Sequence, residues 1–120
     1  MGLLTPEDVF SLHPKIRWAA LALESGMVVF CQMRQGVQSL TPDDEDRAFM
    51  QMGPLFMTGI ALRLTPEHRA GKLEYVISCF EKDCVLMTKV PDGFLALSVA
   101  TPDAFLVFNE LRPKILNLLA

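Results

Sequence analysis

The sequence is poor in the side chains that most often perform catalysis. It has two histidines, His13 and His68, and three cysteines in 120 residues. A catalytic thiolate needs a histidine beside it, yet here the cysteines fall in apolar, strand-like segments and both histidines fall in loops or at helix ends. No GxxxxGK[ST] or GxGxxG motif is present, so nucleotide binding has no support. We therefore predict that the chain is not an enzyme and needs no cofactor.

Ligands with metal-site spacing are also lacking. Cys31, Cys79 and Cys84 are an odd number and lack the spacing of a set of metal ligands. The acidic run at 43–46 could hold a divalent cation, but consecutive helical residues point in different directions, and a helix N-terminus is itself favourable for acidic side chains. We predict no metal site.

The pairing of the cysteines depends on one hairpin. If its two turn residues are Lys82 and Asp83, Cys79 and Cys84 are diagonal neighbours, and a disulfide between them would be strained. Free thiols are therefore expected. An odd number of cysteines also fits a reducing intracellular compartment.

The charge and hydropathy patterns exclude two classes of partner. The net charge is −3, and no cluster of basic residues exists that could bind a phosphate backbone. No apolar stretch approaches the roughly 18 residues that a membrane span requires. The first residues contain acids and no basic segment before an apolar run, which is unlike a signal peptide. We predict a cytoplasmic protein that binds no nucleic acid and does not insert into membranes.

A length of 120 residues predicts one domain, residues 1–120, because it allows a single core and is too short for two. Segments 16–24 and 94–100 are apolar at both odd and even positions, which predicts central strands covered on both faces. Ser25-Gly26 is a hairpin signal, and Trp18 is expected in the core. The predicted fold is α+β, a five-stranded antiparallel sheet with helices on both faces. In order, its elements are a short helix capped by Thr5 and ended by Pro14, strands 16–24 and 27–34, helix 41–64, strands 72–81, 84–90 and 94–100, and a helix starting at 101–103.

The long helix at 41–64 has more apolar surface than one sheet face can cover. Thr41 and Pro42 mark its start. At about 100° per residue, one broad stripe is expected to face the sheet and a second apolar set lies opposite. The second set predicts a contact with another subunit, unless Pro54 kinks the helix and turns that set into core. The sheet-facing stripe is Ala48, Phe49, Met52, Leu55, Phe56, Gly59, Ile60 and Leu62, and the opposite set is Met50, Gly53, Met57 and Ala61.

The last helix is expected to pack on the sheet and to be kinked by Pro113. Its start is marked by the sequence Thr101-Pro102-Asp103. The residues predicted to contact the sheet are Phe105, Leu106, Phe108, Leu111, Ile115, Leu116 and Leu119.

This pattern resembles the roadblock (dynein light-chain type) family, a branch of the longin/profilin-like folds. The resemblance covers residues 16–118: the hairpin IRWAALALESGMVVF, the long amphipathic helix, the three strands and the ending VATPDAFLVFNELRPKI. Two features depart from the family, a shorter N-terminal helix and the Gly53-Pro54 break in the long helix.

The resemblance implies a non-enzymatic homodimer that regulates or scaffolds a small Ras-like GTPase. In such a dimer the long helices lie against each other and the third strands join at their edges. A profilin- or sensor-like module that binds an actin-type protein or a small ligand, in the crevice between the terminal helices and the sheet, is the alternative. A subunit of a vesicle-coat or trafficking complex would share the fold. The predicted dimer interface is Met50, Gly53, Met57 and Ala61 on the helix, with Leu73, Tyr75 and Ile77 along the strand edge.

Overall fold

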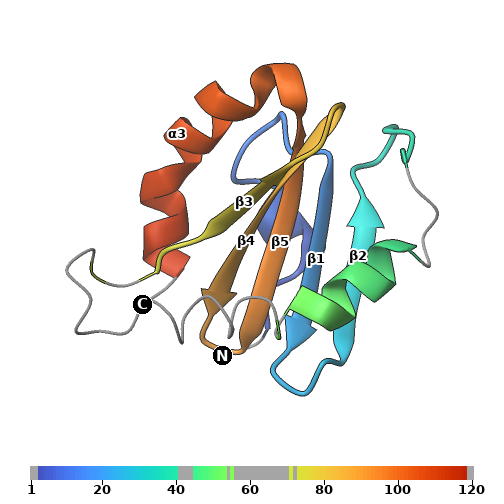
Figure 1. The fold of residues 1–120 in the computed structure, drawn as a ribbon, viewed down its shortest axis with the longest axis vertical. Helices are drawn as coiled ribbons and strands as arrows, with labels where there is room; N and C mark the ends of the chain where they lie inside the picture. Colours follow the sequence, from blue (N-terminus) through green and yellow to red (C-terminus); the bar gives the residue numbers. More distant parts are fainter. Residues whose placement is uncertain (1–2, 41–44, 54, 56–70, 72, 119–120) are drawn as a thin grey trace.

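Five antiparallel strands form a single sheet in the order β2-β1-β5-β4-β3 (Figure 1). The computed structural model describes residues 3–40, 45–53, 55, 71 and 73–118. Residues 45–53 are helical and lie between β2 and β3 in sequence. The predicted α+β fold and the order of its elements are confirmed. The bounds are α1 Pro6–Phe10, β1 Trp18–Leu23, β2 Val28–Met33, β3 Val76–Cys79, β4 Asp83–Val90, β5 Gly93–Ala100 and α3 Thr101–Leu118.

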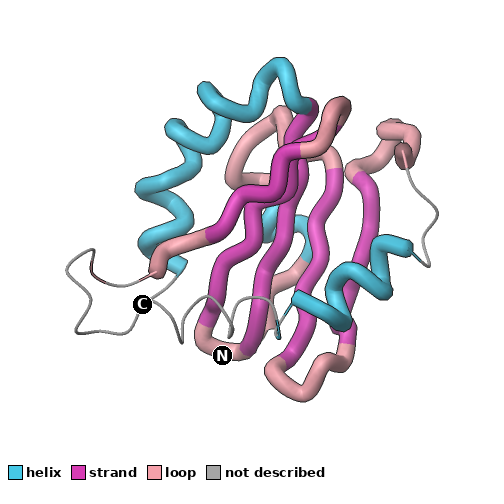
Figure 2. Tube along the Cα trace, in the orientation of Figure 1, coloured by secondary structure: helices cyan, strands magenta, loops and turns pink. Residues whose placement is uncertain are grey.

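Each face of the sheet has its own apolar core, because β1, β4 and β5 are buried at nearly every position. Successive side chains of a strand point to opposite faces, so a strand that is apolar at both parities must be covered twice. Helices α1 and α3 cover one face, and helical residues 45–53 lie over the other (Figure 2). The first core includes Ala19, Leu21, Leu86, Leu95 and Leu97, and the second includes Trp18, Ala20, Ala22, Met87 and Ala96.

The N-terminal helix begins as the sequence predicts, with a capping box. The Thr5 N–H donates to Oδ2 of Asp8 at 2.8 Å, and the Asp8 N–H donates to Oγ1 of Thr5 at 3.2 Å. The guanidinium of Arg34, just after β2, donates to the carbonyl oxygens of Phe10 and His13 at 2.9 and 2.8 Å. Through these bonds Arg34 joins the end of α1 to the edge of the sheet.

The β3–β4 hairpin turns one residue earlier than expected, and this changes the cysteine prediction. The Phe80 N–H donates to the Asp83 carbonyl at 2.8 Å, so Glu81 and Lys82 are the two turn residues. In this register Cys79 lies directly opposite Cys84, and the two form a disulfide. The prediction of free thiols at these two positions was wrong, because the assumed turn shifted the pairing. Cys31 is buried and is not part of this disulfide.

The last helix faces the sheet with a different stripe from the predicted one. Phe108, Leu111 and Ile115 are buried as expected. Phe105, however, is 91% exposed and Leu106 is also exposed, so their predicted packing on the sheet was wrong. The buried positions 104, 107, 108, 111 and 115 follow the helical repeat, and residues 105 and 106 fall outside that stripe. The helix continues through Pro113, Leu116 is half-buried, and Leu119 lies outside the described residues.

Candidate interaction surface

Strand β3 is an edge strand, as the resemblance implies, and β2 is the other edge. The Phe80–Asp83 hydrogen bond fixes the alternation along the hairpin, so Val76 and Ser78 bond to β4. The N–H and C=O groups of Ile77 and Cys79 therefore point away from β4. Ile77 also exposes 40% of its surface. Among the described residues, no strand pairs with this outer edge.

The two other predicted edge residues, Leu73 and Tyr75, lie just before β3. Tyr75 packs partly buried against the core under α3, and Leu73 packs against the core on the opposite face. Between them Glu74 is fixed twice: its carbonyl accepts from Oγ1 of Thr88 at 2.7 Å, and its carboxylate binds Arg112 of α3 at 3.0 and 3.2 Å. Of the three predicted edge residues, Ile77 alone belongs to β3 itself.

Helical residues 45–53 face the sheet with the side that the sequence analysis assigned to a partner. Met50 is completely buried in the core of its own chain. A Cβ added to Gly53 would stand 2.8 Å from Cε and 2.9 Å from Sδ of Met87. Conversely, Met52 and Leu55 were expected in the core but are 67% and 76% exposed.

The helix is therefore rotated relative to the prediction, and the placement of Met50 and Gly53 on its outer face was wrong. The side of the helix that faces the sheet contains half-buried Phe49 and buried Met50 and Gly53, which are spaced as i, i+1 and i+4. Because Gly53 has no side chain, the helix can approach Met87 closely. Met57 and Ala61, the other two predicted interface residues, lie outside the described residues.

Exposed apolar residues also occur on α3, where sequence reasoning did not place them. Phe105 and Leu106 are exposed, and Phe105 borders a cavity of about 380 Å³ between α3 and the β3–β4 hairpin. Exposed apolar side chains that gather beside a cavity are typical of interaction sites. The available signal was the helical repeat: positions 104, 107, 108, 111 and 115 form one stripe, and 105 and 106 fall outside it. The cavity is lined by Tyr75, Ile77, Cys79, Cys84, Thr101, Ala104, Phe105, Phe108 and Asn109.

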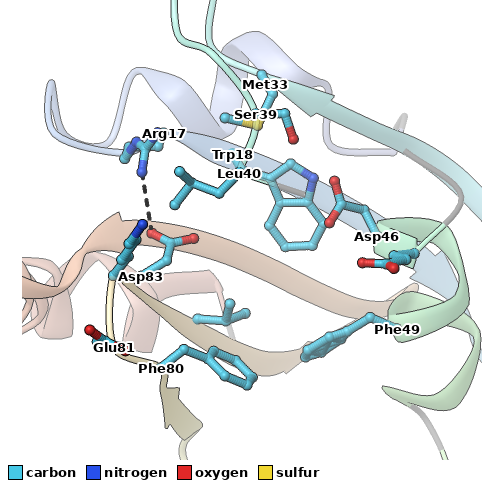
Figure 3. Close-up of a pocket in the computed structure, with 13 residues that line it drawn as sticks. Arg17, Trp18, Met33, Ser39, Leu40, Asp46, Phe49, Phe80, Glu81 and Asp83 are labelled. Atoms are coloured by element: carbon cyan, nitrogen blue, oxygen red, sulfur yellow. Dashed lines mark ion pairs between the residues drawn. The ribbon is translucent and has the colours of Figure 1, made fainter. Parts of the chain in front are cut away.

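A second cavity, of about 480 Å³, lies on the face of the sheet that helical residues 45–53 cover (Figure 3). Trp18 is buried as predicted and forms part of its wall. At its rim Nη1 of Arg17 lies 3.8 Å from Oδ1 of Asp83. Burial raises the pKa of Asp83 above its ordinary value, although Arg17 acts in the opposite direction.

Two classes of site are absent from the described part of the chain. Within residues 3–40, 45–53, 55, 71 and 73–118, no group of three or more His, Cys, Asp or Glu side chains is arranged to hold a metal ion. Over the same residues, no helix is both long and apolar enough to cross a bilayer.

Comparison with solved structures shows that the fold is that of a roadblock/LC7 domain. A roadblock/LC7 domain from Streptomyces avermitilis aligns with 89% of this chain and 88% of its own, at 12% identity and a TM-score of 0.61. Two MglB structures also match. One, described as having a tetrameric arrangement, covers 94% of this chain and 83% of its own at 12% identity and a TM-score of 0.58. The other, from Myxococcus xanthus, covers 88% and 83% at 14% identity and a TM-score of 0.58.

The amino-acid sequence alone matches no protein-family model and no curated protein. At 12–14% identity, the structural likeness establishes the fold.

Proposed function

We propose that the chain is a non-enzymatic homodimeric platform that regulates or scaffolds a small Ras-like GTPase. The observation that supports the dimer most directly is the open edge of β3. Soluble proteins usually protect an edge strand with a charged residue, a proline or a covering segment. The sequence of β3, VISC, has neither a charge nor a proline, and exposed Phe80 follows it.

Pairing of two β3 strands would satisfy the outward backbone groups of Ile77 and Cys79 and would bury the Ile77 side chain. Exposed Met52 and Leu55 offer further apolar surface near the end of the described helical segment. The MglB structure described as tetrameric shows that a chain of this fold can self-associate. The proposed interface therefore uses Ile77, Met52 and Leu55, and it no longer includes Met50 and Gly53.

Ile77→Lys is expected to dissociate the dimer. A lysine on each copy would bring two like charges together at the paired edges and would interrupt their apolar contact. The dissociation constant should rise at least about tenfold, which corresponds to about 1.4 kcal/mol. Light scattering should show the mass falling from twice 13.4 kDa towards 13.4 kDa.

Val29→Lys is the matched control, because Val29 lies on the opposite edge strand and is 38% exposed, close to the 40% of Ile77. This variant should remain dimeric. A wild-type monomer at high protein concentration would refute the dimer, and an unchanged mass for Ile77→Lys would refute pairing through β3.

A GTPase client is supported by the roadblock fold and by the exposed apolar surface of α3. Phe105 and Leu106 are too exposed to stabilise the monomer, and aromatic side chains are enriched in protein interfaces. We expect the tagged chain to recover a small GTPase from its own cell lysate in a nucleotide-dependent manner, since a platform can shift the nucleotide state only by differential affinity.

The measurement is a parallel pull-down with GDP and with a non-hydrolysable GTP analogue. The double variant Phe105→Ser and Leu106→Ser should fold and should lose most of the recovered GTPase. Recovery that is equal with both nucleotides would indicate a structural adaptor in place of a regulator.

A small-ligand module is the second candidate, because the cavity of about 380 Å³ lies between α3 and the sheet. A monomeric protein whose melting temperature rises with a bound small molecule would favour it.

A further inference from the structure

Three aromatic rings from separate parts of the fold surround the cavity of about 480 Å³. Trp18 comes from β1, Phe49 from the helical segment and Phe80 from the end of the β3–β4 hairpin. Figure 3 shows the three rings around one opening. The remaining apolar wall consists of Met33, Leu40 and Val85. The face of an aromatic ring carries negative electrostatic potential, so rings that line a cavity can attract a cation.

The charged residues around the opening make it acidic. Four carboxylates line the cavity against two cationic side chains, a difference of two negative charges at neutral pH. One of the cations, Arg17, is already engaged: Nη2 donates to the Gln38 carbonyl at 3.1 Å, and Nη1 faces Asp83. The carboxylates are Glu45, Asp46, Glu81 and Asp83, and the cations are Arg17 and Lys82.

Two buried polar atoms of the lining have no hydrogen-bond partner among the described residues. They are Nε1 of Trp18, a donor, and Oδ1 of Asp83, an acceptor. Trp18 is only 6% exposed, so the protein covers most of its side chain. A buried polar atom without a partner is costly to the folded protein and is commonly paired by a ligand or an ordered water. Oδ1 of Asp83 already faces Nη1 of Arg17 at 3.8 Å, so the wall offers a guest molecule one donor, the indole N–H of Trp18.

We propose that this cavity binds an organic cation, an alkylammonium group whose carrier also has a hydrogen-bond acceptor. The aromatic faces and the carboxylates attract the cation, and the acceptor takes the hydrogen bond from Nε1 of Trp18. A free small molecule such as choline and a lysine side chain of a bound peptide share this chemistry. None of the residues of the proposed dimer interface, Ile77, Met52 and Leu55, lines this cavity.

Trp18 provides a direct test because it is the only tryptophan of the chain. Its fluorescence should change saturably when choline is added in the millimolar range. The neutral isostere 3,3-dimethyl-1-butanol has the same shape without the charge, and it should bind at least about tenfold more weakly. In an NMR titration, the indole N–H resonance of Trp18 should move as choline binds. A parallel titration with Nα-acetyl-lysine methylamide distinguishes a peptide side chain from a free metabolite: the tighter probe identifies the source.

Phe80→Leu keeps an apolar side chain but removes one ring, and it should weaken choline binding about tenfold because Phe80 is exposed and not part of the core. Met27→Leu, at an exposed apolar residue that does not line the cavity, should leave the affinity unchanged. The proposal is overturned if neither cation gives a saturable response, if the neutral isostere binds equally well, or if Phe80→Leu has no effect in a folded protein.

Discussion

Replacing Met50 with aspartate is expected to unfold most of the protein under conditions in which the wild type is stable. Met50 is completely buried between the helical segment and the sheet, among Trp18, Ala20 and Met87. An aspartate there would lose the packing of the thioether and would place a carboxylate in an apolar core without a charged partner. The free energy of unfolding should fall by at least about 3 kcal/mol, a large part of the total for a small domain. Urea titration followed by circular dichroism measures this loss.

Met52→Asp is the matched control, because the same substitution two residues away falls on an exposed side chain. It should change the monomer's free energy of unfolding by no more than about 0.5 kcal/mol. If Met52→Asp were the more damaging variant, the orientation of the helix would be the one first predicted from its periodicity.

Gly93→Ala is the second substitution with a large expected effect. Gly93 starts β5 and pairs with both Val90 and Leu23. A Cβ at this position would collide with the carbonyl oxygen of Ala22 and would stand 2.9 Å from Cα of Leu23. Since both obstacles are backbone atoms of a central strand, β1 and β5 would have to separate. The expected cost is about 2–4 kcal/mol, and the melting temperature should fall by about 10 °C.

Gly36→Ala is the control, because it measures the cost of alanine at a positive φ without any collision of the added Cβ. Gly36 has a φ of +83°, and a Cβ added there would have no atom within 4 Å, so alanine should cost only about 1 kcal/mol. Equal melting temperatures for the two variants would show that the strands at Gly93 have room to move.

The architecture could be predicted because a strand that is buried on both faces is recognisable from its own sequence. Segments that became β1 and β5 are apolar at both parities, and both are central strands. Capping residues fixed the start of α1 equally well. Helix orientation has no comparable local signal: when apolar residues surround a helix, the side that faces the sheet depends on close contacts such as Gly53 on Met87.

The residues that form the sites are distant in sequence and meet only in the folded protein, so local sequence patterns did not predict most of the sites. The edge position of Ile77 followed from resemblance to a fold, not from its own residue type. A one-residue error in the turn at Glu81 and Lys82 was enough to hide the Cys79–Cys84 disulfide. The cavity beside Trp18 uses residues from β1, the helical segment and the hairpin, which no local pattern relates to one another.

Strand β3 is anchored more firmly at its hairpin end than at its start, so it should fray from its start. The Thr101 hydroxyl donates to the Phe80 carbonyl at 2.8 Å and its N–H donates to the Lys82 carbonyl at 3.1 Å, beside the disulfide. Edge strands fray where few bonds hold them. At the other end of β3, Glu74 is held by the Thr88 hydroxyl at 2.7 Å and by an exposed ion pair with Arg112, with no covalent link. Fraying of β3 therefore begins at Val76, so of the two amides that bond to β4, that of Ser78 should exchange more slowly than that of Val76.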